Sequence, residues 1–253
     1  MDKVRVERKG PVRTVTLARP EKRNALDLEM LDRLTTIFTE PVDKADRVIV
    51  LRGDGDVFCA GIDLRERLAR PAEPGKSPIE PLLHAMEASP LPVVAVVHGD
   101  AIAGGNELAL HCDFVVASAK ARFGMTLAQI GLAPTWPLTK KLLEVAGPVA
   151  AREMLLLGDL LPAKAMLAMG AIARVAEPDA LEAEARKIID RLAANAPISL
   201  RTMKATLVRQ MAFRDDIPHD DIIDMVEVAR RSKDAAEGMR ARLEKRRPIF
   251  TGE

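Results

Sequence analysis

The chain has 253 residues, 48% of them apolar and 30% charged, a balance typical of a folded globular protein rather than a disordered one. Its 38 Lys and Arg residues against 37 Asp and Glu residues leave a formal charge of +1, which argues against a general attraction to nucleic acid or to an anionic membrane. The two cysteines, Cys59 and Cys112, suggest neither a disulfide framework nor a zinc site, and we expect buried thiols.

The sequence shows no apolar stretch of the length that a membrane span requires. Its charged, alternating start is unlike a signal peptide. We therefore expect a cytoplasmic protein.

The first part of the chain predicts a hairpin, a helix and a buried strand. Residues 4–9 and 12–17 alternate apolar and polar side chains around Gly10-Pro11, which predicts a β-hairpin. Residues 48–51 are all apolar, as in a strand that is buried on both faces. Between them, Asp27 is placed to cap a helix whose apolar side is formed by Leu28, Leu31, Leu34, Ile37 and Phe38.

Strands and helices then alternate, which is typical of an α/β layered domain. We expect a short helix near Asp63, a surface loop at residues 70–78, which are rich in Pro and Gly, and a helix at 79–88. Strands are expected at 93–97 and 114–117, with a helix after Gly104-Gly105. From about residue 179 helical periodicity dominates, with breaks at Pro197 and Pro218, so the last third predicts a helical region that packs on the first part or on a neighbouring subunit.

Two glycine-containing segments each follow a predicted strand and precede a predicted helix: FCAGIDL at 58–64 and HGDAIAGGNEL at 98–108. Glycine lets a ligand approach the backbone closely, and the first amides of a helix are unpaired and lie at its positive end. Two such amides that converge on one oxygen would stabilise an oxyanion.

The two segments resemble the oxyanion-hole segments of the crotonase (enoyl-CoA hydratase/isomerase) superfamily. Three further stretches resemble the family in the same chain order: RPEKRNAL at 19–26, RFG with IGL at 122–132, and EGM with EKRRPIF at 237–250.

The resemblance implies an α/β fold, a crotonase-like ββα spiral with a C-terminal helical region. It implies a spiral core at residues 1–196 and a helical trimerisation region at 197–253. It also implies an acyl-CoA substrate, no cofactor other than the coenzyme A carried by that substrate, and a homotrimer or a hexamer built as a dimer of trimers.

The resemblance also assigns roles to single residues. Ile62 and Gly104 would donate the two oxyanion amides. Contacts to coenzyme A would come from Ala25, Ala60 and Leu64, and its phosphates would meet Lys22, Arg23 and Arg65, with Lys245 or Arg246 as further candidates.

Glu107 matches the glutamate that handles water or a proton in the family's hydratases. It lies three residues after Gly104, in the first turn of the predicted helix, from where its carboxylate can face the oxyanion amides.

The chain departs from the hydratase pattern at Leu127, where typical hydratases carry a second glutamate. Leucine cannot transfer a proton, so concerted hydration by two carboxylates is in doubt. The glycine-rich stretch that usually follows is replaced by Pro134-Thr135-Trp136-Pro137. Trp136 would narrow the acyl pocket or would belong to the core.

Three residues are candidates to compensate for Leu127. His111 lies one helical turn after Glu107 and could tune it, or could bond to nearby backbone. Asp63 could reach the cavity or serve as an N-cap, and Asp100 could point into the site or to solvent. Glu107 and His111 lack an evident third ligand, so we predict no metal site.

The sequence therefore predicts an enoyl-CoA hydratase that polarises a thioester carbonyl and uses Glu107 as its acid/base group. One alternative is a Δ3,Δ2-enoyl-CoA isomerase, which can work with a single carboxylate. The other is a CoA-ester-binding member of the family with little hydratase activity.

Overall fold

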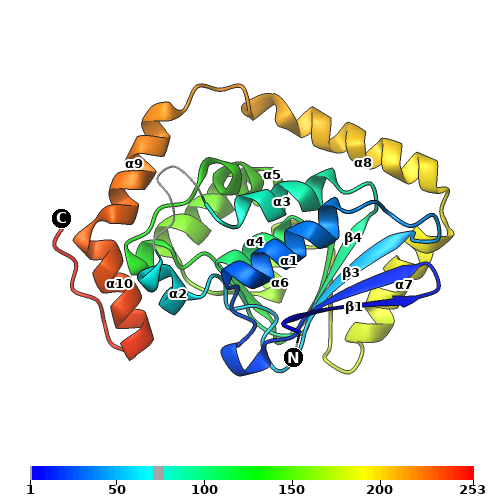
Figure 1. Ribbon diagram of the computed structural model, residues 1–253, viewed down its shortest axis with the longest axis horizontal. Coiled ribbons are helices and arrows are strands. Elements are labelled where there is room, and N and C mark those ends of the chain that lie inside the picture. The colour runs from blue at the N-terminus through cyan, green and yellow to red at the C-terminus, as the bar shows by residue number, and fades with distance from the viewer. Residues whose placement is uncertain (1, 71–76) are drawn as a thin grey trace.

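The computed structural model describes residues 2–70 and 77–253, so most of the predicted loop at 70–78 lies outside the described residues. Within these ranges the main sheet has the strand order β1-β2-β3-β4-β6-β9 (Figure 1). The predicted hairpin is confirmed as β1 (Val4–Lys9) and β2 (Val12–Leu17), which pair antiparallel. The strands that follow are parallel: β3 (Val48–Gly53), β4 (Val93–Val97), β6 (Phe114–Ser118) and β9 (Arg174–Ala176).

The central strands are apolar on both faces because each face covers a different core. Ile49 and Leu51 of β3 face the larger core, whereas Val48 and Val50 face a smaller one under helix α7 (Leu181–Ala194). Successive strand residues point to opposite faces, so the unbroken apolar run fills both cores at once.

Helix α1 (Leu28–Thr39) lies on the opposite side of the sheet from α7 and packs against α3 (Glu80–Ala88) (Figure 1). The carboxylate of Asp27 accepts a hydrogen bond from the Met30 N–H, which confirms the predicted N-cap. The predicted apolar side of this helix is wrong at Leu28, which is the first residue of the helix and is exposed. Met30 is buried in its place.

A second, three-stranded sheet follows, built from β5 (Ala101–Ile102), β7 (Arg122–Gly124) and β8 (Leu161–Pro162). Helix α4 (Gly104–Leu110) starts directly after β5. Helix α5 (Trp136–Arg152) is kinked where Gly147, at φ 74°, precedes Pro148. A π-turn (Glu153–Leu157) and helix α6 (Ala163–Ala168) lead to β9.

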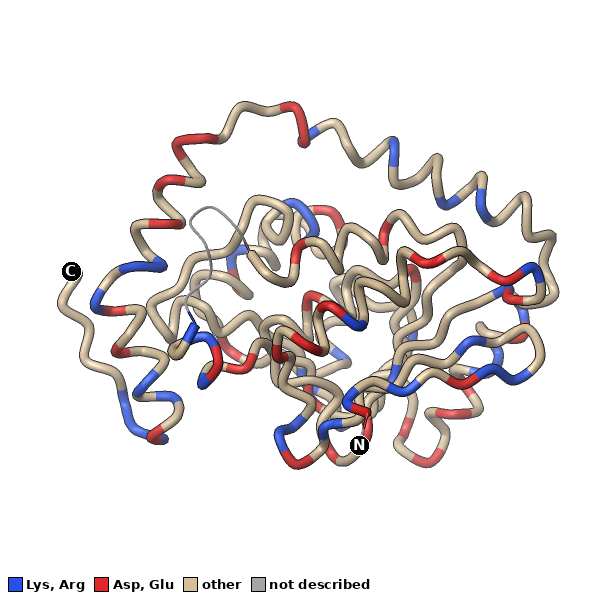
Figure 2. The backbone as a smooth tube through the Cα atoms, viewed as in Figure 1, with Lys and Arg blue, Asp and Glu red and all other residues tan. Residues whose placement is uncertain are grey.

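The C-terminal region forms an arc of three helices around the core: α8 (Pro197–Met211), α9 (Asp220–Arg231) and α10 (Lys233–Glu244) (Figure 1). Both predicted breaks in the helical periodicity are confirmed, because Pro197 is the first residue of α8 and Pro218 lies just before α9. Figure 2 shows Lys and Arg along α8 and acidic residues at the start of α9. Trimerisation by this region stays a prediction.

Lysine 204 fixes α8 to the core. Its buried ammonium donates to the carbonyls of Met86 and Leu91 and to the Asp113 carboxylate at 2.7 Å. Much of the remaining apolar surface of α8 and α9 is exposed: Ile198, Met203, Leu207, Ile222, Ile223, Met225 and Val228.

Helix α10 returns to the core and touches the backbone of the 3₁₀ turn Ala128–Ile130. A Cβ on Gly238 would lie 2.4 Å from the carbonyl of Ile130, and one on Gly131 would lie 2.6 Å from the carbonyl of Asp234. The EGM motif therefore reflects an approach that only glycine permits.

Two further sequence expectations concern the thiols and the membrane. Both cysteines are free and buried, and burial raises the pKa of the Cys59 thiol to about 12. Within the described ranges, no helix combines the length and the apolar character needed to traverse a bilayer.

We expect Gly238→Ala to lower the free energy of unfolding by at least about 1–3 kcal/mol, because the new methyl group would collide with backbone and not with a movable side chain. Arg240→Ala, at an exposed site of the same helix, is the control and should stay within about 0.5 kcal/mol of the wild type. Urea denaturation measures both. Equal stability of the two variants would mean that α10 does not pack as described.

Candidate functional site

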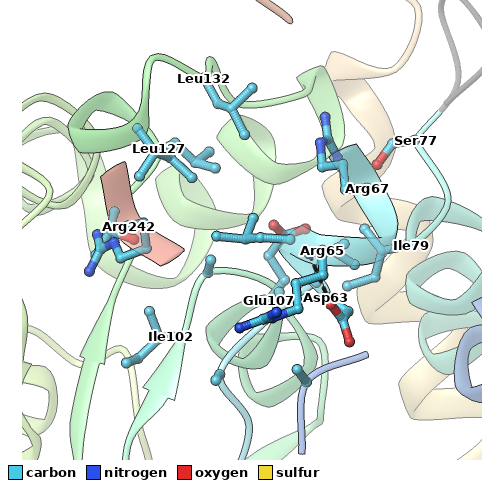
Figure 3. Close-up of a pocket in the computed structure, with 18 of the residues that line it drawn as sticks. Asp63, Arg65, Arg67, Ser77, Ile79, Ile102, Glu107, Leu127, Leu132 and Arg242 are labelled. Carbon is cyan, nitrogen blue, oxygen red and sulfur yellow. Dashed lines mark hydrogen bonds between the residues drawn. The ribbon is translucent and has the colours of Figure 1, made fainter. Parts of the chain in front are cut away.

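A cavity of about 310 Å³, which we name the first cavity, lies between the two glycine segments, the segment after β7 and α10. Figure 3 shows Glu107 in the middle of its lining, with Leu127 and Leu132 to one side and Ile79 to the other. The structure brings together at this cavity most of the candidate residues, namely Lys22, Arg23, Ala25, Ala60, Ile62, Asp63, Leu64, Arg65, Gly104, Glu107 and Leu127.

The segment at 19–26 reaches this cavity because buried Asn24 ties it to the first glycine segment. The Asn24 amide donates to the carbonyls of Asp54, Val57 and Phe58. The Ala60 N–H donates to the Arg23 carbonyl at 3.0 Å, and the Leu26 N–H to the Gly61 carbonyl at 2.8 Å. These bonds hold the side chains of residues 22, 23 and 25 at the cavity wall.

Ile62 and Gly104 both line the first cavity, and their backbone N–H groups have no hydrogen-bond acceptor among the described residues. They are close neighbours: a Cβ built on Gly104 would lie 3.4 Å from the Ile62 nitrogen, and one on Gly61 would lie 3.1 Å from the Gly104 nitrogen. Gly61 has φ 91°, a conformation that suits glycine and turns the next N–H away from the Leu26 bridge. The pair can therefore bind one anionic oxygen.

Alanine 103 turns the chain into α4 and fixes the second of these amides. It has φ 49° and ψ −116°, a strained conformation for a residue with a Cβ. Its own N–H donates to the Gly124 carbonyl at 2.8 Å. The next N–H, that of Gly104, is then the first free amide of the helix.

The carboxyl of Glu107 has a raised pKa. The residue is 8% exposed and lies in the first turn of α4. Burial, helped by the negative charge of Glu80, raises its pKa to about 7, although the cation of Arg67 acts in the opposite direction. No hydrogen bond joins its carboxylate to another described residue. The group can therefore gain or lose a proton near neutral pH.

Leucine 127 lies among other apolar residues of the first cavity, Ile130, Leu132 and Leu138. Of the described lining residues, only Asp63 and Glu107 carry a carboxylate. Asp63 is occupied, since it caps α2 (Leu64–Ala69) and accepts a hydrogen bond from Arg19 at 2.8 Å. Burial would raise its pKa, but these partners lower it. Asp63 is therefore an N-cap, and Glu107 alone is available as an acid/base group.

Three of the expected site residues lie elsewhere in the described structure. Asp100 is not at the first cavity, because both of its carboxylate oxygens accept hydrogen bonds from Arg122, at 3.0 and 2.6 Å. His111 bonds to backbone: its Nδ1 lies 2.8 Å from the Glu107 carbonyl. Burial lowers the pKa of His111 to about 4, so the ring is neutral at physiological pH.

Tryptophan 136 belongs to a second cavity, of about 290 Å³, between α5 and α9. Its ring stacks on His219 with the centroids 4.4 Å apart. The replacement of the usual glycine-rich stretch thus mainly changes the wall of a neighbouring chamber, although Thr135 of this stretch also lines the first cavity.

Sequence reasoning missed several residues of the two cavities. Arg67 is on α2, two residues after Arg65, and the spacing alone gave a weak signal for it. Arg230 and Arg242 come from α9 and α10, and no local pattern relates them to the glycine segments. Arg246 is instead paired with Glu237 and Glu244. A group of three or more His, Cys, Asp or Glu suited to a metal ion is absent from the described part of the chain.

The raised pKa of Glu107 predicts a pH-dependent stability. Its carboxyl ionises near 4.5 when unfolded and near 7 when folded, so a rise in pH favours the unfolded state across this window. Relative to Glu107→Gln, the wild type should lose on the order of 2 kcal/mol of unfolding free energy between pH 5.5 and 8.5. Denaturant titration at both pH values measures this, with Glu21→Gln, at an exposed site, as the control. A pH-independent difference between wild type and Glu107→Gln would contradict the burial of an ionisable Glu107.

Known proteins resemble this chain over nearly its whole length. The (E)-benzylidenesuccinyl-CoA hydratase of Thauera aromatica is 33% identical, over 98% of this chain and 99% of its own. The 1,2-epoxyphenylacetyl-CoA isomerase of Escherichia coli is 34% identical, over 95% of each chain. A crystal structure of an enoyl-CoA hydratase from Mycobacterium avium subsp. paratuberculosis K-10 superposes with a TM-score of 0.88 at 30% identity, over 99% of both chains. The profile of the enoyl-CoA hydratase/isomerase family matches residues 7–253, and the chain belongs to this family.

Proposed function

We propose that this protein is an enoyl-CoA hydratase that adds water across the double bond of a 2-enoyl-CoA. One observation carries the proposal: two unpaired backbone N–H groups and one buried carboxyl of raised pKa share the first cavity. The first can hold an enolate oxygen, and the second can exchange a proton at neutral pH.

The coenzyme A moiety would enter beside the segment at 19–26. The exposed cations of Lys22, Arg23 and Arg65 suit its phosphates, and Arg242 of α10 adds a further positive charge to the cavity wall. Ala25, Ala60 and Leu64 offer small or apolar surface to the rest of the cofactor portion. The exposed apolar side chains of α8 and α9 support assembly into a homotrimer or a pair of trimers.

In the proposed reaction the thioester oxygen accepts hydrogen bonds from the N–H groups of Ile62 and Gly104. Ionised Glu107 removes a proton from water as the water oxygen bonds to Cβ, and the π electrons move towards the thioester oxygen to form an enolate. The same carboxyl then gives its proton to Cα as the carbonyl re-forms. One carboxyl both receives and returns the proton, so no second acid at position 127 is required.

Isomerisation of a 3-enoyl-CoA to a 2-enoyl-CoA is the second candidate, and the apolar setting of Leu127 favours it. A lone carboxyl can remove a proton from Cα and return it to Cγ without binding water. Separate incubation with 2-pentenoyl-CoA and 3-pentenoyl-CoA distinguishes the two reactions: hydration of the first supports the hydratase, and conversion of the second supports the isomerase. A protein that binds both esters and converts neither would be a CoA-ester-binding member of the family.

Glu107→Gln should lower kcat for hydration of crotonyl-CoA by about 10²–10⁴-fold, because the amide cannot exchange the proton. Affinity for butyryl-CoA, which cannot react, should change little. In the wild type kcat/KM should rise with pH and level off above about 7, since ionised Glu107 starts the reaction. Asp100→Asn, a carboxylate away from the cavity, is the control. A rate unaffected by Glu107→Gln would refute the assigned role.

Gly104→Ala tests the amide pair without unfolding the protein. The new methyl would lie 3.4 Å from the Ile62 nitrogen, close to the proposed oxyanion position, 3.4 Å from the Gly61 Cα and 3.2 Å from the movable Ile79 Cδ1. We expect kcat/KM to fall by about 10²–10³-fold at a nearly unchanged Tm. Gly105→Ala is the contrasting variant, because its methyl would meet the Cys59 carbonyl at 2.2 Å and lower the Tm. Full activity in Gly104→Ala would show that the acyl oxygen binds elsewhere.

A further inference from the structure

The side chain of Arg67, a cation of the first cavity, points in a different direction from that of Arg65. Arg65 and Arg67 both project from α2 but point apart (Figure 3). Residues two apart on a helix face different sides. Arg65 is exposed, whereas Arg67 is half-buried and interacts electrostatically with Glu107, Glu227 and Arg230. Arg67 is thus on the Glu107 side of the site, where the acyl group would lie.

The guanidinium of Arg67 makes no hydrogen bond and no ion pair with any residue that the structure describes. Burial, and the like charge of Arg230, lower its pKa, so its surroundings do not fully compensate its charge. Arginine stays protonated in proteins, and a half-buried guanidinium has five donors to satisfy. An anionic ligand in the cavity would satisfy them.

The described acids around Arg67 do not provide the anionic partner that its guanidinium needs. Glu107 acts on Arg67 electrostatically, but with a pKa of about 7 its carboxyl is only partly ionised near neutral pH. Glu227 is bonded to Arg230 at 3.1 Å and to Arg231 at 2.6 Å. Burial raises the pKa of Glu80 as well, and this carboxyl interacts with Thr135 and with the cation of Arg230.

The second cavity extends the site in this direction, because Thr135 and Arg230 line both cavities. Its wall carries Glu80, Asp215, His219 and Glu227 beside apolar residues of α9. These polar groups have partners within the described structure: Asp215 pairs with Lys140, His219 stacks on Trp136, and Glu227 is bonded to Arg230 and Arg231.

We propose that the acyl group accepted here carries a second carboxylate, which Arg67 binds. The proposal rests on the proposed function, because it assumes that a CoA ester places its acyl group beside Glu107. The substrate class is then a dicarboxylic acyl-CoA, with the thioester at the Ile62 and Gly104 amides and the free carboxylate at the guanidinium. A bidentate guanidinium–carboxylate contact supplies both the charge and the geometry.

Binding of matched, unreactive esters tests the proposal by calorimetry at pH 7.5 and 0.15 M salt. Glutaryl-CoA and valeryl-CoA have the same chain length and differ in a terminal carboxylate or methyl group. The pair of succinyl-CoA and butyryl-CoA tests a shorter acyl chain. The pair of adipyl-CoA and hexanoyl-CoA tests a longer one. At one or more lengths the carboxylated ester should bind at least about tenfold more tightly, which corresponds to about 1.4 kcal/mol.

Arg67→Met should abolish this preference, while Arg70→Met, at an exposed site at the end of the same helix, should retain it. Equal or tighter binding of the neutral ester at every length would overturn the proposal. So would a preference that survives in Arg67→Met, or tightest binding of 5-aminovaleryl-CoA, whose ammonium would instead be selected by the acids.

Failure of this inference is distinguishable from failure of the proposed function. Hydration of crotonyl-CoA without any preference for a carboxylated ester would refute only the role of Arg67. If none of the esters binds, both the proposed function and this inference are overturned.

Discussion

Two backbone N–H groups that the fold leaves without acceptors are the feature on which the site depends. Their freedom has a structural cause at each end: Gly61 adopts a positive φ that turns the Ile62 N–H away from the Leu26 bridge, and strained Ala103 makes Gly104 the first residue of α4. Unpaired donors beside a cavity are unfavourable until a ligand supplies the acceptor. The same arrangement that costs stability in the free protein prepares it to bind a developing negative charge.

The carboxyl of Glu107 is matched to these donors by burial. In water a glutamate would be fully ionised at pH 7 and a weak proton donor. At 8% exposure and near the charge of Glu80 it ionises near pH 7, so it can take a proton and give it back. In the proposed mechanism this property would compensate in part for Leu127, because a single carboxyl with a central pKa can serve in both directions, whereas Asp63 is committed to its helix and to Arg19.

The C-terminal helices contribute to the site as well as to the surface. Helix α10 reaches the segment after β7 through glycine contacts at Gly131 and Gly238, and it brings Arg242 to the cavity wall. Helix α9 supplies Arg230 and closes a second chamber against α5. The two cavities are therefore lined by residues more than 100 positions apart in the chain. Changes in α9 can alter the second cavity without touching the amide pair or Glu107.

The sequence by itself determined the local features. Period-two and continuous apolar patterns located the hairpin and the buried strands, Asp27 and Asp63 marked helix starts, and two glycine segments located the amides, because each of these depends on neighbours a few residues away. Only the tertiary structure decided which side chains meet at the cavity. It showed that three predicted residues lie outside the first cavity: Asp100 pairs with Arg122, His111 bonds to backbone, and Trp136 stacks on His219. It added Arg67, Arg230 and Arg242. Partner choice and pKa depend on distance and burial across the folded chain, and no spacing along the sequence encodes either one.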